Sequence, residues 1–467
     1  MTQIPILQGV YSDSTASFRQ SLPINLEAFV IDTGISKGYL GTAPGIVALG
    51  EGPGADRGSF TWEGVCYRVM GSKLVSVSQG GTVTELGSVG DNGKPVSFDN
   101  SFDRMAVASN ENLFYYTPTE GVTQVTDPDL GIVLDVLFID GRFMTTDGEF
   151  LVLTDLNDPY AIDPLRYGSA EVSPDPIRAL KRIRGEVYAL GSDTIENFRN
   201  VGGAGFPYQR NSGALIPKGT VGTHASAYFA ETFAFVGGAP NEAPSVYLAG
   251  SGQADPIGTS EIDYELSLLS AEELAAVELE SRREQDDERL YVHLPTKTLV
   301  FYGQASKAAG QPIWGILCDG LAFDQAYPAR HMARAYGKWM VGTSDGLIGN
   351  IDATIETRFG ETVGWQCDTV FLYNESRYFI VHEVELVGLP GRMPLGEDAR
   401  VFMSTTQDGQ TYGNERAVSA GTQGQRRKRV VWRPNRKAAN YLSMRFRGAD
   451  TAMTAWARLE ARIEPLG

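Results

Sequence analysis

The sequence predicts an all-β protein, in which a β-propeller of six or seven blades precedes a C-terminal β-sandwich-like domain and carries one inserted helix. Three observations lead to this fold class. The chain has 467 residues, 42% of them hydrophobic and 21% charged, which is the composition of a globular protein. Its length is too great for one compact core of ordinary size. Its 53 glycines and 20 tyrosines favour a turn-rich β protein. The third observation is an internal repeat.

The repeat is a phrase in which an apolar run, a tight turn and a second apolar run follow one another. Two of its copies read "CYRVMGSKLVSVSQGGTVTELG" and "LFIDGRFMTTDGEFLVLTDLND". Gly80-Gly81, Asp147-Gly148 and Asp345-Gly346 separate such runs, as short hairpin loops require. Successive copies begin near Tyr67, Met105, Phe138, Ile183, Tyr228, Leu290 and Ala335.

The spacing of the copies decides between repeat architectures. Most gaps are about 33 to 46 residues, and a four-stranded propeller blade takes about 40 to 50 residues. A solenoid would show helices or shorter periods, and a chain of sandwiches would divide into units of about 100 residues. The spacing therefore favours a propeller.

Charge divides the chain near residue 365. Residues 366–467 hold 15 Lys and Arg against 11 Asp and Glu, a balance of +4, which leaves 25 against 46, or −21, for residues 1–365. We therefore expect an N-terminal arm or blade-completing segment over residues 1–60, the propeller over residues 61–365 and a separate sandwich-like domain over residues 366–467. In this last part, "SRYFIVHEVELVGLP", "ARVFMSTTQDG", "KRVVWRP" and "NYLSMRFRG" alternate as strands do.

A glycine-rich stretch, "PSVYLAGSGQADPIG" at residues 244–258, raises the question of a phosphate-binding loop. Such a loop needs glycines at set spacing before a helix N-terminus, often with a lysine, and this stretch has neither feature. We interpret it as the turn and outer strand of one blade, extended by an insertion. In the insertion, Ser270 and Glu273 predict a capping box that begins a helix. That helix is either a solvated element between blades or a subunit contact.

Residue types that carry catalysis or bind metals are scattered. The four histidines, His224, His293, His331 and His382, have no second ligand at short spacing, so we expect no metal site and no His-centred catalytic pair. The segment "TQDGQTY", residues 406–412, is similar to the Asp-box turn of sialidase-type propellers, but it occurs once and a surface hairpin turn explains it better. We predict that the protein has no cofactor and is not an enzyme.

Cysteine usage and hydropathy bear on the compartment. Cys66, Cys318 and Cys367 lie far apart, which predicts free thiols in a protein made in a reducing cytosol. No window approaches the roughly 18 unbroken apolar residues of a membrane span. The N-terminus "MTQIPILQGVYSDS" lacks the basic segment and continuous apolar core of a secretory signal.

A basic run near the C-terminus, "RRKRVVWRPNRK", holds the candidate contact residues. One hypothesis is phosphate binding, with the Trp432 ring as a stacking surface. The other is an exposed pair of strands whose charges are solvated or meet an acidic neighbouring subunit, and the acidity of residues 1–365 favours self-association or partner contact over contact with DNA. The candidate inter-subunit or partner contacts are Arg426, Arg427, Lys428, Arg429, Trp432, Arg433, Arg436 and Lys437.

Several phrases in this order carry a family resemblance. They are "SFRQSLPINLEAF" and "SKGYLGTAPGI" near the N-terminus, "APSVYLAGSGQADPI" and "YVHLPTKTLVFY" in the middle, and "VFMSTTQDGQTYGNER" with "KRVVWRPNRK" near the C-terminus. Together they make the chain resemble the packaged-DNA stabilisation proteins, or tail accessory factors, of short-tailed bacteriophages. The match extends over nearly the whole chain.

The resemblance implies a structural protein of the virion tail, assembled in the bacterial host cytoplasm. It implies a ring of copies, expected to be a hexamer, beneath the phage portal and adaptor proteins. The ring would help retain packaged double-stranded DNA, which passes through its lumen before DNA ejection, and would provide attachment for the tail needle or plug and for tailspikes. An acidic lumen would let DNA slide without sticking. The family supplies no catalytic residues. The alternative function is a propeller hydrolase or carbohydrate-binding protein that acts on the host surface.

Overall fold

The computed structural model describes residues 2–6, 9, 20–31, 34–156, 158–170, 175–203, 205–250, 252–449, 451 and 453–466. Strands dominate, and no helix in these ranges is both long and apolar enough to cross a membrane. The chain forms two compact units. We call residues 48–282 with 328–350 the propeller unit, and residues 1–47, 283–327 and 351–467 the sandwich unit.

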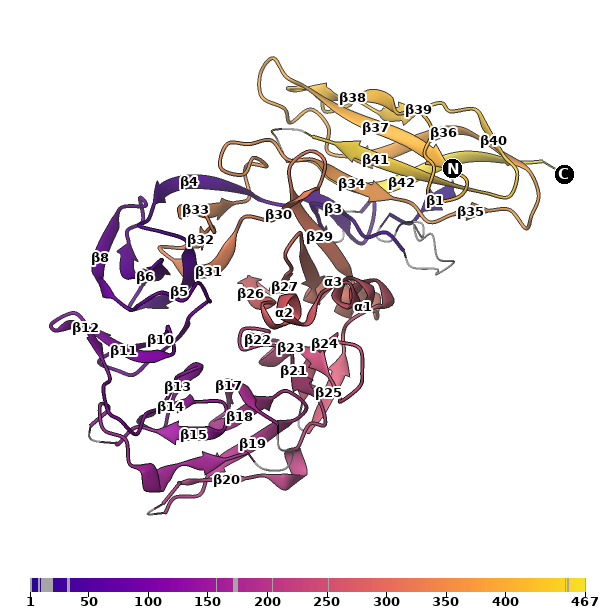
Figure 1. The fold of residues 1–467 in the computed structure, drawn as a ribbon. Coiled ribbons are helices and arrows are strands. Elements are labelled where there is room, and N and C mark those ends of the chain that lie inside the picture. The colour runs from indigo at the N-terminus through magenta and orange to yellow at the C-terminus, as the bar shows by residue number, and fades with distance from the viewer. Residues whose placement is uncertain are drawn as a thin grey trace. The chain divides into compact units, whose positions relative to one another are not determined.

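The propeller unit consists of consecutive small sheets, as the repeat predicts (Figure 1). The first two sheets are β5 (Asp56–Trp62), β6 (Val65–Met70), β7 (Lys73–Val77) and β8 (Val83–Ser88), and β9 (Ser97–Asn100), β10 (Met105–Ser109), β11 (Asn112–Thr117) and β12 (Gly121–Gln124). The next two are β13 (Asp135–Ile139), β14 (Arg142–Thr146), β15 (Phe150–Leu153) and β16 (Gly168–Ser169), and β17 (Ile177–Ile183), β18 (Glu186–Gly191), β19 (Ile195–Asn200) and β20 (Tyr208–Arg210). Each of these four sheets is an antiparallel meander in chain order.

Two further sheets of this unit depart from the simple meander. The fifth sheet has the order β21-β23-β24-β25, with β22 also paired to β23, and the last has the order β31-β32-β33-β4. Its outer strand β4 therefore comes from the N-terminal segment, and the Gly52 N–H donates to the Gly346 carbonyl at 2.9 Å beside it. The strands are β21 (Gly219–Thr220), β22 (Ser226–Phe229), β23 (Thr232–Gly238), β24 (Ser245–Gly250), β25 (Gln253–Pro256), β31 (Arg330–Ala335), β32 (Lys338–Gly342), β33 (Leu347–Asp352) and β4 (Gly45–Glu51).

The apolar core of the propeller unit lies in layers between neighbouring sheets. Val69 and Leu74 of the first sheet pack with Met105 and Val107 of the second, and similar clusters follow at the next sheet boundaries. Sheets can pack face to face in this way because alternate residues of each strand point to opposite faces. The predicted turns separate the strands: at Asp147-Gly148, between β14 and β15, the Asp147 carboxylate accepts the Glu149 N–H at 2.8 Å.

The insertion after the fifth sheet differs in detail from the expectation. The glycine-rich stretch forms the hairpin of β24 and β25, with β25 at the outer edge, as interpreted from the sequence. A helix that the sequence did not predict, α1 (Ser260–Ser267), follows it, and the predicted capping box begins α2 (Ala271–Ala275). The predicted helix ends after five residues because α2 buries no side chain, whereas Val277 and Leu279 bury theirs where strand β26 (Glu278–Glu284) begins.

The sandwich unit contains two packed sheets and strands of a third one. The first sheet has the order β2-β3-β42-β36-β39, with β1 and β40 added, and the second has the order β34-β41-β37-β38, with β35 added. Their strands are β1 (Thr2–Ile4), β2 (Leu26–Phe29), β3 (Tyr39–Thr42), β34 (Trp365–Asp368), β35 (Leu372–Tyr373), β36 (Phe379–Gly388), β37 (Asp398–Thr406), β38 (Arg416–Thr422), β39 (Val430–Trp432), β40 (Arg436–Ala438), β41 (Tyr441–Gly448) and β42 (Ala455–Pro465).

Aromatic side chains join these two sheets. The rings of Trp365 and Trp456 lie 5.7 Å apart between β34 and β42, and those of Trp432 and Phe446 lie 5.3 Å apart between β39 and β41. All four side chains are buried. The third sheet contains β27 (Asp287–His293), β28 (Thr298–Tyr302), β29 (Trp314–Asp319) and β30 (Gln325–Ala326), with helix α3 (Gly303–Ala309) between β28 and β29. Two 3-10 helices, Pro164–Arg166 and Ser212–Ala214, complete the elements of the described residues.

Candidate functional site

The inner strands of the propeller blades carry carboxylates whose partners are backbone amides of the next blade. The N–H of Phe138 in β13 donates to Asp99 Oδ2 in β9 at 2.6 Å, and the N–H of Leu180 in β17 donates to Asp135 Oδ2 in β13 at 2.8 Å. An inner strand is the edge of its sheet, so its outward amides need acceptors from outside that sheet. These carboxylates therefore link neighbouring blades.

A histidine, His331 in β31, lies at the centre of a charged cluster at the inner strands. Its Nδ1 lies 2.6 Å from Asp56 Oδ2, and its Nε2 lies 2.8 Å from Glu278 Oε2. Because both ring nitrogens face carboxylates, both must carry protons and the ring is an imidazolium. Burial alone would lower the pKa of His331, but the charges of Glu278 and Asp56 outweigh it and raise the pKa to about 10.

Local backbone geometry aims the His331 ring. Its φ of 51° lies in the left-handed region, and the pairing of β31 with β32 shifts register between Arg330 and Ala333. Such bulges redirect a side chain at the edge of a sheet. The carboxylate of Glu280 holds this irregular backbone, since it accepts the N–H groups of His331 and Met332, each at 2.6 Å.

The cluster extends to arginines on either side. Arg68 donates two hydrogen bonds to Asp56, at 2.8 and 2.7 Å, and both side chains are fully buried. Arg330 Nη1 lies 3.1 Å from Glu278 Oε1. Asp56 and Glu278 thus each contact two cationic side chains, which leaves neither carboxylate free to act as a general base.

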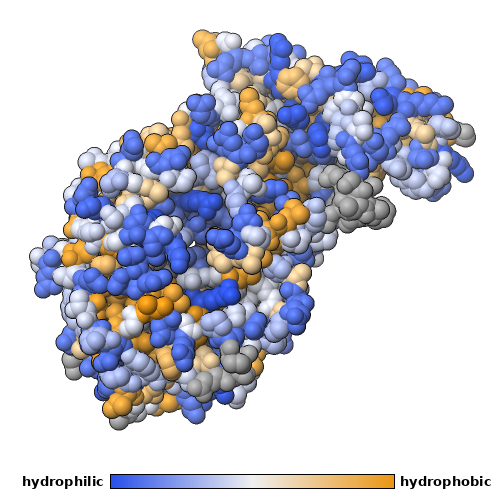
Figure 2. Space-filling model, in the orientation of Figure 1, coloured by the Kyte–Doolittle hydropathy of each residue, from blue (hydrophilic) through white to orange (hydrophobic). Residues whose placement is uncertain are grey.

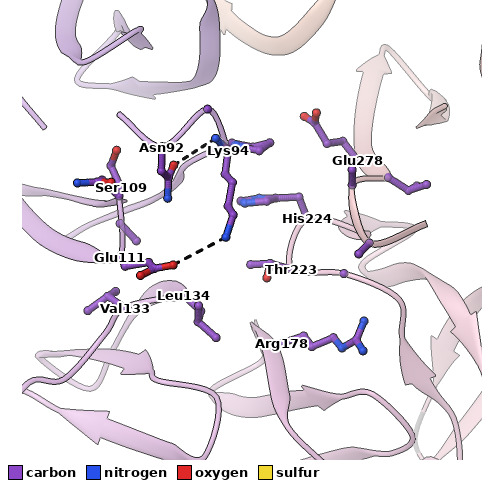
Figure 3. Close-up of a pocket in the computed structure, with 18 of the residues that line it drawn as sticks. Asn92, Lys94, Ser109, Glu111, Val133, Leu134, Arg178, Thr223, His224 and Glu278 are labelled. Carbon is purple, nitrogen blue, oxygen red and sulfur yellow. Dashed lines mark hydrogen bonds and ion pairs between the residues drawn. The ribbon is translucent and has the colours of Figure 1, made fainter. Parts of the chain in front are cut away.

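A cavity of about 540 Å³ opens beside this cluster in the propeller unit (Figure 3). Lys94 points toward Glu111 across one wall, with 3.8 Å between the charged atoms, and His224, Arg178 and Glu278 line the opposite side. Burial lowers the pKa of His224, so that ring is neutral at physiological pH. Among the described residues, no group of three or more His, Cys, Asp or Glu side chains is placed to hold a metal ion.

The basic run lies at the edge of a sandwich sheet. Strand β39 pairs with residues 384–386 of β36, and β40 pairs with residues 379–381, so the run follows one edge. Arg429 Nε donates to Glu385 Oε1 at 2.9 Å and Arg433 Nε donates to Glu383 Oε2 at 3.0 Å, so these two predicted contact residues are engaged within the chain. Charged side chains are a common protection of exposed edge strands.

Trp432 lies in the core of the sandwich unit. Only 2% of it is exposed, and its Nε1 donates to the Arg416 carbonyl at 2.8 Å. The prediction that its ring offers a stacking or contact surface is therefore wrong for this structure, because strand alternation turns Trp432 inward where Val431 turns outward.

The remaining predicted contact residues are exposed. Arg426, Arg427 and Lys428 lie in the turn before β39 and form no ion pair with any described residue. Arg436 and Lys437 lie on β40, where the Lys437 ammonium sits 4.3 Å from the centre of the Tyr378 ring. The structure therefore divides the predicted contacts into a free basic turn, two engaged arginines and two residues on β40.

The "TQDGQTY" segment is the hairpin loop between β37 and β38, as the sequence indicated. Asp408 Oδ1 accepts the N–H groups of Thr411 at 2.7 Å and Gln410 at 2.9 Å, and these bonds hold the pKa of Asp408 below its usual range. Its carboxylate is used by the turn itself.

The inner-strand carboxylates escaped the sequence analysis, although a signal was present. Asp56, Asp99 and Asp135 each lie in the first strand of three successive repeats, Asp56 and Asp135 at the start of theirs and Asp99 nearer the following turn. The partners of His331 are far from it in sequence, so the spacing of histidines could not reveal them.

Two family models match the chain. One, described as the β-propeller of bacteriophage P22 Gp10, matches residues 2–356, and the other, described as the β-sandwich of the same protein, matches residues 364–464. The tail hub protein gp10 of Salmonella phage P22 is 29% identical to this chain over an aligned length of 485 positions, gaps included, and the alignment covers 99% of each protein.

Solved structures of propellers are only weakly similar. The N-terminal domain of Nup159 has a TM-score of 0.41 at 10% identity, and the Pan2 WD40 domain of Neurospora crassa has a TM-score of 0.42 at 9% identity. Each match covers 66% of this chain and 95% of the other. Scores this low carry no argument about function.

Proposed function

Because the chain belongs to the bacteriophage P22 Gp10 family and is a structural protein of a phage tail, we propose that its copies form a ring in the short tail, below the portal and adaptor. In this proposal the ring has six copies, helps to retain packaged double-stranded DNA and provides attachment for the needle or plug and for tailspikes. The observation that carries it is the match to a tail hub protein over 99% of both chains.

The propeller chemistry supports a structural role over a hydrolase or carbohydrate-binding one. Retaining and inverting glycosidases need two carboxylates that flank the substrate. Here Asp99 and Asp135 bind backbone amides, and Glu278 is paired with His331 and Arg330. An enzyme at this site would have to break contacts that hold the blades together.

Charge supports assembly through unlike surfaces. Residues 1–365 carry a balance of −21, and the basic turn of Arg426, Arg427 and Lys428 is free of ion pairs with the described residues. A contact between different surfaces of two identical subunits closes into a ring when the rotation per subunit divides the circle. Exposed ion pairs contribute about 0 to 1 kcal/mol each, so their main effect is on orientation and association rate.

The tail function is tested in purified particles. Quantitative mass spectrometry should find a fixed number of copies per particle, in stoichiometric ratio to the portal. Deletion of the gene should give heads that package DNA and then lose it. Particles that lack the protein yet keep their DNA and infect normally would refute the proposed function.

The basic turn is tested by the triple reversal Arg426→Glu, Arg427→Glu and Lys428→Glu. Arg429 should be left in place, because a glutamate there would lie against Glu385 and Glu383. If the turn contacts a neighbouring subunit, the folded variant enters particles poorly, and high salt partly reproduces the defect in the unaltered protein. If the turn contacts DNA instead, the variant enters particles normally and the particles leak their genome.

A further inference from the structure

One long segment of the propeller unit contains acidic residues but no basic ones. Between Lys218 and Arg282, residues 219–281 contain ten Asp and Glu and no Lys or Arg. This segment forms the fifth sheet, α1, α2 and the start of β26. Because it has no basic residue, this segment carries a net charge of −10, against −17 for the whole chain.

Helix α1 presents a mixed acidic and apolar stripe away from its buried face. Ile262 and Leu266 are fully buried, and the helix contacts β24 of its own unit. Glu261, Tyr264, Glu265 and Leu268 follow at spacings of three and four residues, which places them on one face of a helix. On that face Tyr264 is 38% exposed and Leu268 is 60% exposed.

A second surface, in the sandwich unit, has the opposite charge and a similar apolar content. Two loops, residues 389–396 and 423–428, meet there, since the Gly424 N–H donates to the Gly391 carbonyl at 3.1 Å. Arg392, Arg426, Arg427 and Lys428 are exposed on them, and neither loop contains an acidic residue. We call these two loops the basic loop pair.

Two leucines of the basic loop pair lie in solvent. Leu389 is 51% exposed and Leu395 is 87% exposed. The carboxylates that follow directly in sequence, at Glu397 and Asp398, accept hydrogen bonds from Thr451 and Ser419. On the face drawn in Figure 2, polar residues form most of the surface and hydrophobic residues gather only in small patches. Exposed leucines beside uncompensated cations are typical of a contact surface.

We propose that α1 of one copy docks on the basic loop pair of a neighbouring copy. The inference rests on the proposed ring and names the two surfaces that would form it. Tyr264 and Leu268 would pack with Leu389 and Leu395, and the flanking charges would pair around them. A nucleic acid would satisfy the arginines but would leave both leucines in water, whereas α1 offers partners for both kinds of group.

Charge exchange between copies tests this contact directly. The loop variant carries Arg426→Glu, Arg427→Glu and Lys428→Glu in the basic loop pair. The helix variant carries Glu261→Lys and Glu265→Lys in α1. A third variant carries both sets on one chain. The control carries Glu120→Lys and Glu149→Lys, which lie at exposed turns of other blades. It changes the net charge of the protein as much as the helix variant does. Sedimentation velocity of the full-length proteins at low salt measures self-association, and circular dichroism verifies folding.

The proposal predicts that the loop variant and the helix variant each self-associate at least about tenfold more weakly than the unaltered protein. This corresponds to a loss of about 1.4 kcal/mol or more in the free energy of association. An equimolar mixture of the two, and the variant with both sets, should associate again because each restores unlike charges. Leu268→Ala should weaken association without a change of charge. The control should associate as the unaltered protein does.

Three outcomes would overturn the contact. In the first, single-set variants associate normally, which leaves the ring intact but assigns its contact to other surfaces. In the second, the unaltered protein stays monomeric at low salt while particle analysis still finds it in tails, which separates this failure from a failure of the tail function. In the third, the basic loop pair is needed instead to bind anionic vesicles or double-stranded DNA in co-sedimentation, and α1 has no effect.

Discussion

Replacement of His331 by leucine tests the charged cluster at the inner strands of the propeller. The substitution removes the cation between Asp56 and Glu278 and fills its place with a side chain that cannot donate a hydrogen bond. Removal of one partner from a buried charged pair costs about 3 to 5 kcal/mol. Asp56 keeps Arg68 and Glu278 keeps Arg330, so we expect a loss of about 3 kcal/mol in the free energy of unfolding of the propeller unit, at the lower end of that range.

The pH dependence of the free energy of unfolding provides a second, independent test of the charged cluster. The pKa of His331 is 6.5 in an unfolded chain and about 10 in the folded one. Its contribution to stability is therefore complete below pH 6.5 and disappears as the pH rises through about 10. Between these limits the folded state holds one more proton, and the free energy of unfolding falls by up to about 1.4 kcal/mol per pH unit. From pH 7 to pH 9 the unaltered protein should lose about 2 to 3 kcal/mol, and His331→Leu should not show this slope.

Two measurements check these values. Urea unfolding at pH 7 and pH 9, followed by pulsed hydrogen exchange, distinguishes peptides of the propeller unit from those of the sandwich unit. A pH titration of ring-labelled histidine follows the four histidine signals by nuclear magnetic resonance. His382→Leu is the matched control, because the His382 ring also contacts a carboxylate, that of Glu464, but at a more exposed position, where such a contact is worth about 0 to 1 kcal/mol. A His331 ring that titrates near pH 6.5, or equal effects of the two substitutions, would refute the reasoning.

Three further predictions follow from the burial or exposure of single residues. Trp432→Ala should lower the free energy of unfolding of the sandwich unit by about 3 to 5 kcal/mol, because the indole is a core side chain, and urea unfolding read by hydrogen exchange of that unit measures the loss. Burial raises the pKa of the Cys66 and Cys367 thiols, so a thiol reagent should label them in urea but only slowly in the native protein, as mass spectrometry would show. A glutamate-specific protease should cut first at Glu361, which is exposed next to Gly360, and early fragments from within either family-matched region would contradict this.

Sequence alone determined the all-β class, the propeller and the sandwich, because these depend on local signals. Turn residues such as Asp147-Gly148 must occupy hairpin loops, and the period of the apolar runs sets the size of a blade. The capping box at Ser270 and Glu273 was predictable for the same reason, since its two hydrogen bonds join residues three apart. The length of the helix that it begins was not, because burial of Val277 and Leu279 ended it.

Only the tertiary structure decided which charged residues have partners. His331 lies 275 residues from Asp56 and 53 from Glu278, and no sequence spacing predicts that these three side chains meet. Strand alternation and sheet pairing turned Trp432 inward and engaged Arg429 with Glu385, so a run that looks uniformly basic leaves only part of its charge free. Local patterns report what the backbone does, whereas the partners of a charged side chain depend on which distant strands fold beside it.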